Sequence, residues 1–553
     1  MTDPLPDHLE GKLIIGIDLG TTKSGVAVFD KASGKPVMLR DELGDDTIPS
    51  VVAWDRDGKD WLVGTAAKAV LAERPWDVAY SVKRFIGRPF SDRAVAAGRE
   101  NVTYAVTGGN DDELLRDVRI RFGQEGAVHH TLDVPEISAK ILARLRRTAA
   151  NALGLRVDDV KHAVITVPAY FDMRQRMATQ LAGKLAGLEV EAILHEPTAA
   201  ALAHSDELLA PDERTILVYD MGGGTFDISL LDVSRDAHGY QFYTRLIDGN
   251  THLGGDDIDA AIARTFEREI EKRSGHSVRA DDARTRARLR LAAEQAKRAL
   301  TTSETTQVEL PQLELGSVAP FDLTLDLSRA EMEAIAAPTL KRAQDITERA
   351  VTNVAGLAWT DIDEVVLVGG QTQMPAIQRS VERFTGKRPR VSDRPQTAIA
   401  LGAAVYAHML SQGRKRFEQH ALTNTIALAL GFRVDDNKFR KVVEANVTVP
   451  HQSPDVGVAT TRDDQTAIVI DVLQGRHDAT LADDCVSLGS LRMEVPPAPA
   501  GQIRYGVRFE VAADGTMTVT VTDPRRNRSE PLVIGDRALL VLREQRRAES
   551  VGQ

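Results

Sequence analysis

Residues 14–22 read Ile-Ile-Gly-Ile-Asp-Leu-Gly-Thr-Thr, and residues 217–225 read Leu-Val-Tyr-Asp-Met-Gly-Gly-Gly-Thr. Each stretch is an apolar run that reaches an Asp and continues into a glycine turn with hydroxyl side chains. A second apolar run follows each turn, at residues 25–29 and 226–230. Apolar runs that are separated by a glycine turn predict a strand, a tight turn and a strand, made twice in the chain.

The two turns have the chemistry of a phosphate site. Glycine lets the backbone bend close to an anion, its N–H groups can point at phosphate oxygens, and threonine adds hydroxyl donors. Asp18 and Asp220 end the two first strands and can hold a hydrated Mg²⁺ between the turns. The duplication therefore predicts two related lobes that close on one Mg-nucleotide.

Composition is typical of a soluble globular protein. The 553 residues predict roughly three or four domains. Apolar residues make up 42% of the chain and charged residues 27%, which are ordinary values. The net charge of −11 argues against a nucleic-acid partner. No apolar run approaches the roughly 20 residues that cross a bilayer, so no membrane partner is expected.

Two features indicate the compartment. The first ten residues are acidic and contain two prolines, and they lack the basic and apolar regions of a signal peptide. Cys485 is the single cysteine, which excludes an intramolecular disulfide and fits a reducing compartment. We interpret it as a small buried hydrophobe rather than a reactive thiol. A cytoplasmic protein is expected.

The character of the sequence changes near residue 413. Residues 12–412 alternate strand and helix patterns, with strands expected at 163–167 and 365–368 and helices at 135–151, 175–186 and about 278–302. A polar, basic linker is expected at 413–423. Residues 424–534 carry strand-like runs at 425–430, 442–449, 467–473, 505–511 and 517–521, which predict a β-sandwich. A short helical tail is expected at 535–553.

Further segments resemble the Hsp70 chaperones. In the first domain they are 166–171 (Thr-Val-Pro-Ala-Tyr-Phe), 196–201 (Glu-Pro-Thr-Ala-Ala-Ala), 251–257 (Thr-His-Leu-Gly-Gly-Asp-Asp), and 368–370 (Val-Gly-Gly) with 402–404 (Gly-Ala-Ala). In the second they are 446–450 (Asn-Val-Thr-Val-Pro), 472–475 (Val-Leu-Gln-Gly) and 487–489 (Ser-Leu-Gly). The resemblance implies a two-lobed actin-like ATPase domain of α/β class, followed by an all-β peptide-binding sandwich. The family's long helical lid is not expected, so the chain resembles a short, lidless bacterial branch of the HscC type.

The resemblance implies a role for each residue around the phosphates. Asp18 and Asp220 would order the waters around Mg²⁺. The residues that would contact the β- and γ-phosphates are Thr21, Thr22, Gly222, Gly223 and Gly224, and Thr225 would place its hydroxyl beside the γ-phosphate. Lys83 would stabilise charge on the transferred phosphoryl group, while Glu196 and Asp227 would orient or deprotonate the attacking water. ATP or ADP with Mg²⁺ is the expected cofactor, with K⁺ as a further candidate ion.

The nucleoside side of the site is also implied by the resemblance. Glu294, Lys297 and Arg298 are spaced i, i+3 and i+4, so they share one helical face. Glu294 and Lys297 would contact the ribose hydroxyls and Arg298 the base. A surface ion pair of little energetic worth is the alternative. Backbone at Gly254, Gly369 and Gly370 would approach the nucleotide, with ordinary turns as the alternative.

Two positions depart from the family at the adenine. Gln373 stands where an Arg commonly packs on the base, and Gln396 stands where an Asp is usual. An uncharged Gln loses a cation–π contribution of about 0.5–2 kcal/mol. Weaker adenine binding and faster ADP release are therefore expected.

The linker and the co-chaperone surface also depart from the family. Residues 419–424 are mostly polar where family members have an acidic and leucine-rich run, while the interdomain relay residues Pro168 and Arg176 match. Ala192, His195 and Asn424 replace the charged and amide residues that meet a J-domain co-chaperone. We expect either a dedicated, divergent J-protein or no stimulation, and the nucleotide-exchange factor stays open.

The peptide cleft is the fourth departure. Ile468 and Ile470 align with the floor of the family's apolar pocket and Phe432 with a flanking wall, with plain core packing as the alternative. Asp435 and Asp436 replace apolar and glycine residues of the arch over the peptide.

Three functions compete at this point. The leading one is an ATP-driven chaperone that binds and releases extended apolar segments of client polypeptides. The second is a nucleotide-dependent regulatory or scaffold protein with one dedicated partner. Sugar kinases and actin-like filament proteins share the duplicated turns, but the β-domain and the context of Glu196 argue against both.

Overall fold

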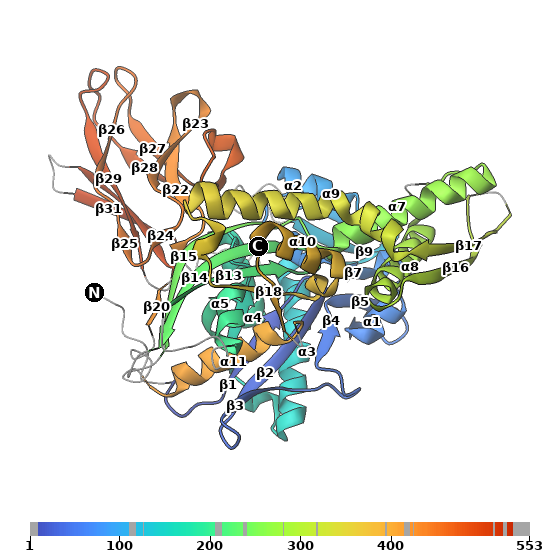
Figure 1. Ribbon diagram of the computed structural model, residues 1–553. Helices are drawn as coiled ribbons and strands as arrows, with labels where there is room; N and C mark the ends of the chain where they lie inside the picture. The colour runs from blue at the N-terminus through green and yellow to red at the C-terminus, as the bar shows by residue number, and fades with distance from the viewer. Residues whose placement is uncertain are drawn as a thin grey trace.

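The computed structural model describes residues 9–109, 118–124, 126–204, 213–235, 240–279, 281–316, 319–392, 395–413, 421–423, 425–512, 515–523 and 528–534. Its central feature is a sheet that occurs twice with the same strand order and directions. The predicted duplication is thus present in the fold, and Figure 1 shows both sheets at the centre of the molecule.

The first sheet has the order β12 (Glu189–His195), β11 (His162–Val167), β1 (Ile14–Leu19), β2 (Lys23–Asp30) and β3 (Lys35–Met38), with β4 (Thr47–Pro49) also on β2. The second has β19 (Arg390–Val391), β18 (Glu364–Val368), β13 (Arg214–Met221), β14 (Phe226–Arg235) and β15 (Tyr240–Asn250). In each sheet the first three strands run parallel and the next two antiparallel. Because β1 and β13 hold equivalent places, the two glycine turns leave equivalent edges.

Two helices pack between the sheets and bring the turns together. They are α5 (Glu196–Ala203) and α11 (Ala398–Ser411). A Cβ atom on Gly402 would lie 1.7 Å from the carbonyl oxygen of Ala199, so the helices touch at a position that only glycine allows. One apolar cluster joins them to both sheets through residues such as Val164 and Val366.

Smaller elements extend each lobe above its sheet. The first lobe adds β5 (Val51–Asp55), β6 (Asp60–Val63), β7 (Val78–Tyr80), β8 (Ala105–Gly108), β9 (Val118–Gln124) and β10 (Ala127–Asp133). The second adds α7 (Gly255–Ser274), α8 (Ala283–Thr302), β16 (Thr305–Leu313), β17 (Phe321–Ser328) and α9 (Arg329–Glu348). Each lobe has its own apolar core. Helices predicted at 135–151, 175–186 and 278–302 correspond to α3 (Val134–Leu153), α4 (Met173–Leu185) and α8.

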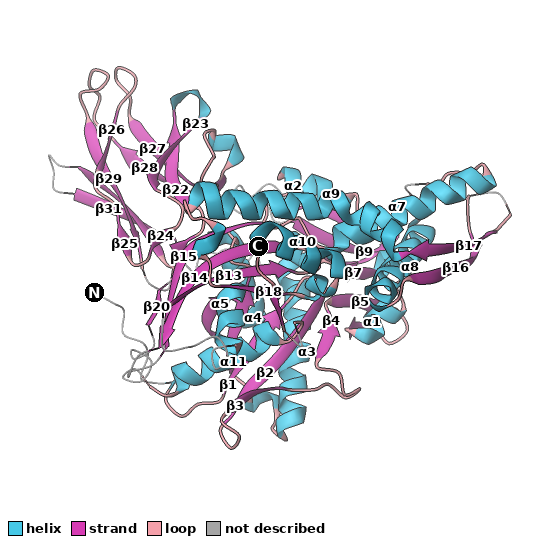
Figure 2. Ribbon diagram, viewed as in Figure 1, coloured by secondary structure: helices cyan, strands magenta, loops and turns pink. Residues whose placement is uncertain are grey.

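Most strands of the C-terminal part form two sheets that enclose a core. One has the order β23 (Lys438–Val443), β22 (Ala429–Val434), β27 (Ala467–Gly475) and β28 (Val486–Glu494). The other has β25 (His451–Gln452), β29 (Arg504–Val511), β30 (Met517–Asp523) and β31 (Arg528–Ile534), with β26 (Val456–Ala459) on β29. Figure 2 shows strands and loops with only short helical turns here.

Two predicted strands are wrong in their extent. Residues 425–430 were expected to form one strand, but β21 spans only Thr425–Ile426 and β22 begins at Ala429. Residues 442–449 were expected to form one strand, but β23 ends at Val443 and β24 spans only Val447–Thr448. Asn446 lies between them with φ of 63°, in the left-handed region, which interrupts an extended run. An apolar pattern does not reveal such a turn.

The β-domain packs against the first lobe and the edge of the second sheet. β20 (Ala421–Thr423) pairs in parallel with β15, so part of the predicted linker is a strand of that sheet. Met173 and Met177 of α4 share the apolar core of the β-domain. The backbone N–H of Ile247 donates to Oδ1 of Asn446 at 2.8 Å. Residues 414–420 and the predicted tail at 535–553 lie outside the described residues.

In the part of the chain that the structure describes, no helix combines the length and the apolar character that a membrane crossing needs.

Candidate functional site

The two glycine turns lie directly against each other. A Cβ atom on Gly223 would lie 1.7 Å from Oγ1 of Thr22, and one on Gly224 would lie 2.5 Å from Cγ2 of Thr21. Such distances exclude any side chain at these two positions, so glycine is a steric requirement here. Thr21 and Thr225 are buried at the same junction. The structure therefore brings together the threonines and glycines that the sequence selected as phosphate ligands.

Four carboxylates and one lysine surround the junction. Asp18 lies on β1, and Asp220 on β13 is directly opposite Asp227 on β14. Glu196 begins α5 and accepts a hydrogen bond from Nζ of Lys83 at 2.6 Å. Lys83 lies in a short 3₁₀ turn at Val82–Arg84, and all five side chains are buried.

The electrostatics of this group show a deficit of positive charge. Burial, and then repulsion from Glu196, raise the pKa of Asp18 to about 7. The same two causes raise the pKa of Asp227 to about 8 and that of Asp220 well above its usual value. Among the described residues, Oδ2 of Asp220 and Oδ2 of Asp227 are buried and have no hydrogen-bond partner. Orphaned carboxylate oxygens in excess of cations are the donor set that Mg²⁺ and its waters prefer, so the residues fit this ion.

Two of the side chains expected to bind adenosine, Lys297 and Glu294, already have partners within the protein. Lys297 is buried, pairs with Oδ1 of Asp259 at 2.9 Å and donates to the carbonyl of Gly255. Both oxygens of Glu294 accept from Nζ of Lys68, at 2.7 and 2.8 Å. Arg298 is exposed, as is Gln373. A ribose at Glu294 and Lys297 would have to share or replace these partners.

The three glycines predicted to approach the nucleotide differ in their packing. A Cβ on Gly254 would lie 2.6 Å from the carbonyl oxygen of Gly223, and one on Gly369 would lie 2.4 Å from that of Met221. Gly369 also has φ of 82°. The nearest contact at Gly370 is an ordinary 3.4 Å to Gln396. A side chain is therefore excluded by the neighbouring backbone at Gly254 and Gly369, but not at Gly370.

The predicted relay residues lie between the predicted nucleotide site and the β-domain. Pro168 directly follows β11, and Arg176 lies on α4 with Nη1 3.1 Å from Nε2 of His195. A Cβ atom on Gly515 of the β-domain would lie 3.0 Å from Nη2 of Arg176. Ala192, on the predicted co-chaperone surface, is half-buried, and Asn424 lies outside the described residues.

The predicted peptide residues lie together in the core of the β-domain. Phe432, Ile468 and Ile470 are 1%, 5% and 3% exposed and belong to one apolar cluster. Asp435 and Asp436 are exposed at the turn between β22 and β23. The structure thus buries all three apolar side chains in the core of the β-domain.

Sequence reasoning missed a set of contacts between the two lobes. Ser81 donates to Oδ2 of Asp256 at 2.5 Å, and Nη2 of Arg84 lies 2.6 Å from Oδ2 of Asp257. Nζ of Lys23 donates to Oε1 of Gln396 at 2.9 Å. Each contact joins the first lobe to the second. The adjacency of Arg84 to Lys83, and of Lys23 to Thr22, was the available signal.

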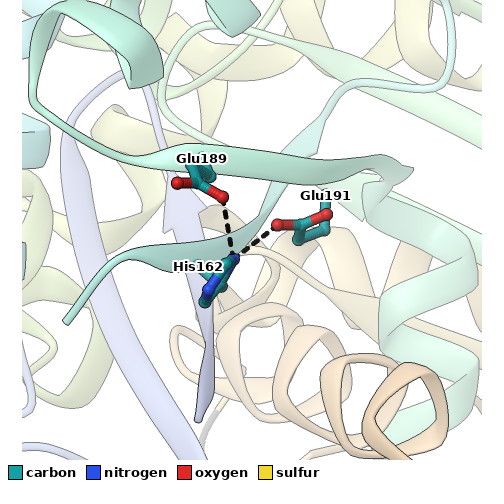
Figure 3. Close-up of side chains that lie close together, drawn as sticks. All are labelled: His162, Glu189 and Glu191. Carbon is teal, nitrogen blue, oxygen red and sulfur yellow. Dashed lines mark hydrogen bonds and ion pairs between the residues drawn. The ribbon is translucent and has the colours of Figure 1, made fainter. Parts of the chain in front are cut away.

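A histidine and two glutamates lie close together at the other end of the first sheet. Nδ1 of His162 lies 2.6 Å from Oε1 of Glu191 and 3.3 Å from Oε2 of Glu189. Figure 3 shows both glutamates turned toward the histidine. These residues are at or near the starts of β11 and β12, whereas His195 is the last residue of β12 and Glu196 follows it. The contacts within the cluster satisfy His162, and we assign no metal to it.

The comparison with known families agrees with this geometry. A model of the family described as Hsp70 protein matches residues 14–547. The match covers both lobes, their paired glycine turns and the β-domain, and the chain therefore belongs to the Hsp70 family.

Proposed function

We propose that this chain is an ATP-hydrolysing chaperone whose β-domain binds and releases extended apolar segments of client polypeptides. Proteins of the Hsp70 family are in general nucleotide-dependent chaperones with ATPase activity, and they bind ATP or ADP with Mg²⁺. The observation that carries the proposal is the Lys83–Glu196 pair, with a separation of 2.6 Å, beside Asp18 and Asp220 at the meeting point of the two turns.

Each side chain has a distinct task in this proposal. Bound Mg²⁺ would neutralise phosphate charge. Asp18 and Asp220 would hold its water shell, and burial, and then repulsion from Glu196, raise the pKa of both carboxyls. Lys83 would stabilise the charge that develops on the transferred phosphoryl group. Glu196 and Asp227 would orient the attacking water and accept its proton.

The contacts between the domains support coupling of the two activities. Met173 and Met177 of the first lobe share the core of the β-domain, and β20 extends the second sheet. Movement of the lobes around the nucleotide would therefore disturb the base of the β-domain. Nucleotide binding would then change the affinity for peptide, and peptide binding would change the affinity for nucleotide by the same factor.

The experiment is single-turnover ATP hydrolysis by the full chain, with and without an apolar peptide. Lys83→Ala and Thr225→Ala should each slow hydrolysis by about 100-fold or more. Lys140→Ala is the matched control, because Lys140 is a half-buried lysine of the same lobe whose Nζ lies 4.3 Å from the Trp61 ring centroid. Equal rates for the wild type and Lys83→Ala would refute the assignment of Lys83.

A second candidate is a nucleotide-dependent regulator with one dedicated partner. The observation that favours it is the charged turn at Asp435 and Asp436, near the network in which Arg433 contacts Asp471 and Asp483. Carboxylates at this edge would disfavour a broad range of acidic or purely apolar segments. Binding to a peptide array separates the two functions, because a chaperone should bind many apolar peptides and a regulator a single sequence.

The co-chaperone is part of the same proposal. Hsp70 proteins generally work with J-domain partners. Here Ala192 and buried His195 occupy the expected contact surface, which supports a divergent, dedicated J-protein. A general J-protein should accelerate hydrolysis less than tenfold, and a larger acceleration would contradict this part.

A further inference from the structure

Lys23 is the first residue after the phosphate turn of the first lobe and opens β2. Its backbone is fixed by that turn, because a Cβ on Gly20 would lie 2.1 Å from the carbonyl oxygen of Lys23. The preceding residue, Thr22, has a buried hydroxyl with no hydrogen-bond partner among the described residues, and it touches the second turn at Gly223. The side chain of Lys23 therefore extends from backbone that is fixed next to the place where the two turns meet.

The partner of Lys23 is neutral and comes from the other lobe. Nζ donates to Oε1 of Gln396 at 2.9 Å. Gln396 lies near Gly370, because a Cβ on Gly370 would lie 3.4 Å from the Gln396 side chain. An amide oxygen offers a dipole but no countercharge, so this bond leaves the positive charge of the lysine uncompensated.

Two cations and two anions surround Lys23. Lys68 and Arg298 are the cations that face it, and Glu294 and Asp45 are the anions. Glu294 has both oxygens engaged by Lys68. Burial, and then repulsion from Arg298 and Lys68, lower the pKa of Lys23. A partly buried ammonium in this setting is a ready partner for a polyanion.

We propose that Lys23 is a direct ligand of the proximal phosphates of the bound nucleotide, the α- and β-phosphates that remain after hydrolysis. Its neighbours place it on the nucleoside side of the junction, since Glu294 and Arg298 face it while Lys83 and Glu196 lie with the Mg²⁺ carboxylates. A phosphate there would replace the Gln396 amide as the acceptor. The inference rests on the proposed nucleotide site and assigns that site an additional cation.

This assignment has a consequence for nucleotide retention. A charge-assisted bond to the phosphates adds affinity for ATP and ADP alike, because both contain the α- and β-phosphates. It would offset the weaker adenine contact expected at Gln373. Lys23 would thus contribute to nucleotide binding, whereas Lys83 would stabilise the phosphoryl group during its transfer.

The test measures affinity of the full chain for Mg-ADP and for adenosine by displacement of a fluorescent nucleotide. Lys23→Gln should weaken ADP binding by about tenfold or more and leave adenosine binding unchanged. Lys23→Arg keeps the charge and should restore ADP binding to within about threefold. Lys140→Gln, the matched half-buried lysine, should change neither. In steady-state hydrolysis, Lys23→Gln should raise KM for ATP more than it lowers kcat.

A second variant and a measurement of inhibition by inorganic phosphate complete the test. Gln396→Glu leaves Lys23 in place but neutralises it, and should also reduce ADP affinity severalfold even if Lys23→Gln fails to fold. If Lys23→Gln altered inhibition by free inorganic phosphate but not ADP affinity, the ligand would be the released phosphate, and the proposal would be overturned. Equal losses for ADP and adenosine would overturn it as well.

The outcomes separate this inference from the proposed function. A wild type that hydrolyses ATP with ADP affinity independent of Lys23 would retain the function and remove the Lys23 assignment. A wild type that binds ADP through Lys23 but does not hydrolyse ATP would do the reverse. A wild type that binds no nucleotide would refute both.

Discussion

Nε2 of His195 lies 3.1 Å from Nη1 of Arg176, and the two residues belong to elements that face different parts of the protein. His195 ends β12 and directly precedes Glu196, the partner of Lys83. Arg176 lies on α4, where Nη2 reaches the β-domain at Gly515. A continuous line of residues thus joins the proposed nucleotide site to the β-domain.

Replacement of His195 tests this line. His195→Ala removes the acceptor of Arg176 and should reduce the stimulation of ATP hydrolysis by peptide about two- to thirtyfold, the range of coupling changes caused by residues between two sites. The measurement is the ratio of peptide-stimulated to basal rate. His162→Ala is the control, since His162 is equally buried at the far end of the neighbouring strand. The same ratio in His195→Ala and the wild type would exclude a relay role.

The buried histidine also predicts a pH dependence of stability. Burial, and then the charge of Arg176, lower the pKa of His195 from 6.5 to about 3. Below pH 6.5 the unfolded chain therefore binds a proton at His195, whereas the folded protein binds it only near pH 3. The free energy of unfolding should fall as pH decreases from 6.5 toward 3, by at most about 1.4 kcal/mol per pH unit.

Urea unfolding at pH 7.5 and 5.5 measures this effect. The wild type should lose about 1 kcal/mol more than His195→Asn between the two values, because only the wild type has this titration. His252, whose pKa burial also lowers, is present in both proteins and cancels in the comparison. Identical losses in the two proteins would show that His195 is protonated in the folded state.

The Lys83–Glu196 pair predicts non-additive stabilities. Both side chains are at most 7% exposed, so Lys83→Met leaves Glu196 buried among Asp18, Asp220 and Asp227 without a cation. Loss of one member of a buried pair typically costs about 3–5 kcal/mol. Lys83→Met with Glu196→Gln should recover much of that loss. Chemical unfolding without nucleotide measures it, and a double variant less stable than Lys83→Met would contradict the argument.

The triple glycine contains its own control. Gly223→Ala would place a Cβ 1.7 Å from Oγ1 of Thr22, whereas the nearest contact of a Cβ on Gly222 is 3.8 Å away. Gly223→Ala should therefore separate the turns and reduce ADP affinity by at least about 100-fold, the scale of a lost phosphate contact set. Gly222→Ala should lose far less in the same ADP titration. Equal losses would mean that the glycines serve flexibility rather than close approach.

The duplicated fold was predictable because its signals are local. Apolar runs mark the strands β1, β11, β13 and β18, and glycine turns between strands mark the phosphate junction. Contacts between distant residues have no such signal. The Lys23–Gln396 bond joins positions 373 residues apart, and the His195–Arg176 contact depends on how α4 packs beside β12. The interruption of a predicted strand at Asn446 was not predicted, because a left-handed backbone conformation at one residue does not change the apolar pattern of the sequence.

Docking of the β-domain depends on a side chain at the start of α4. The backbone N–H of Met173, the first residue of that helix, donates to Oε1 of buried Gln474 at 2.9 Å. The first N–H groups of a helix lack partners within the helix, so Gln474 satisfies one across the domain boundary. Gln474→Ala leaves this group without an acceptor when the domains are packed, which costs about 1–3 kcal/mol. The packed arrangement should therefore be less populated, and protease cleavage within residues 413–424 should become faster.

Gln474→Glu is the matched variant, because a carboxylate retains the acceptor and is favoured at a helix N-terminus. It should be cleaved no faster than the wild type, and faster cleavage of Gln474→Glu than of Gln474→Ala would show that the hydrogen bond does not hold the domains together.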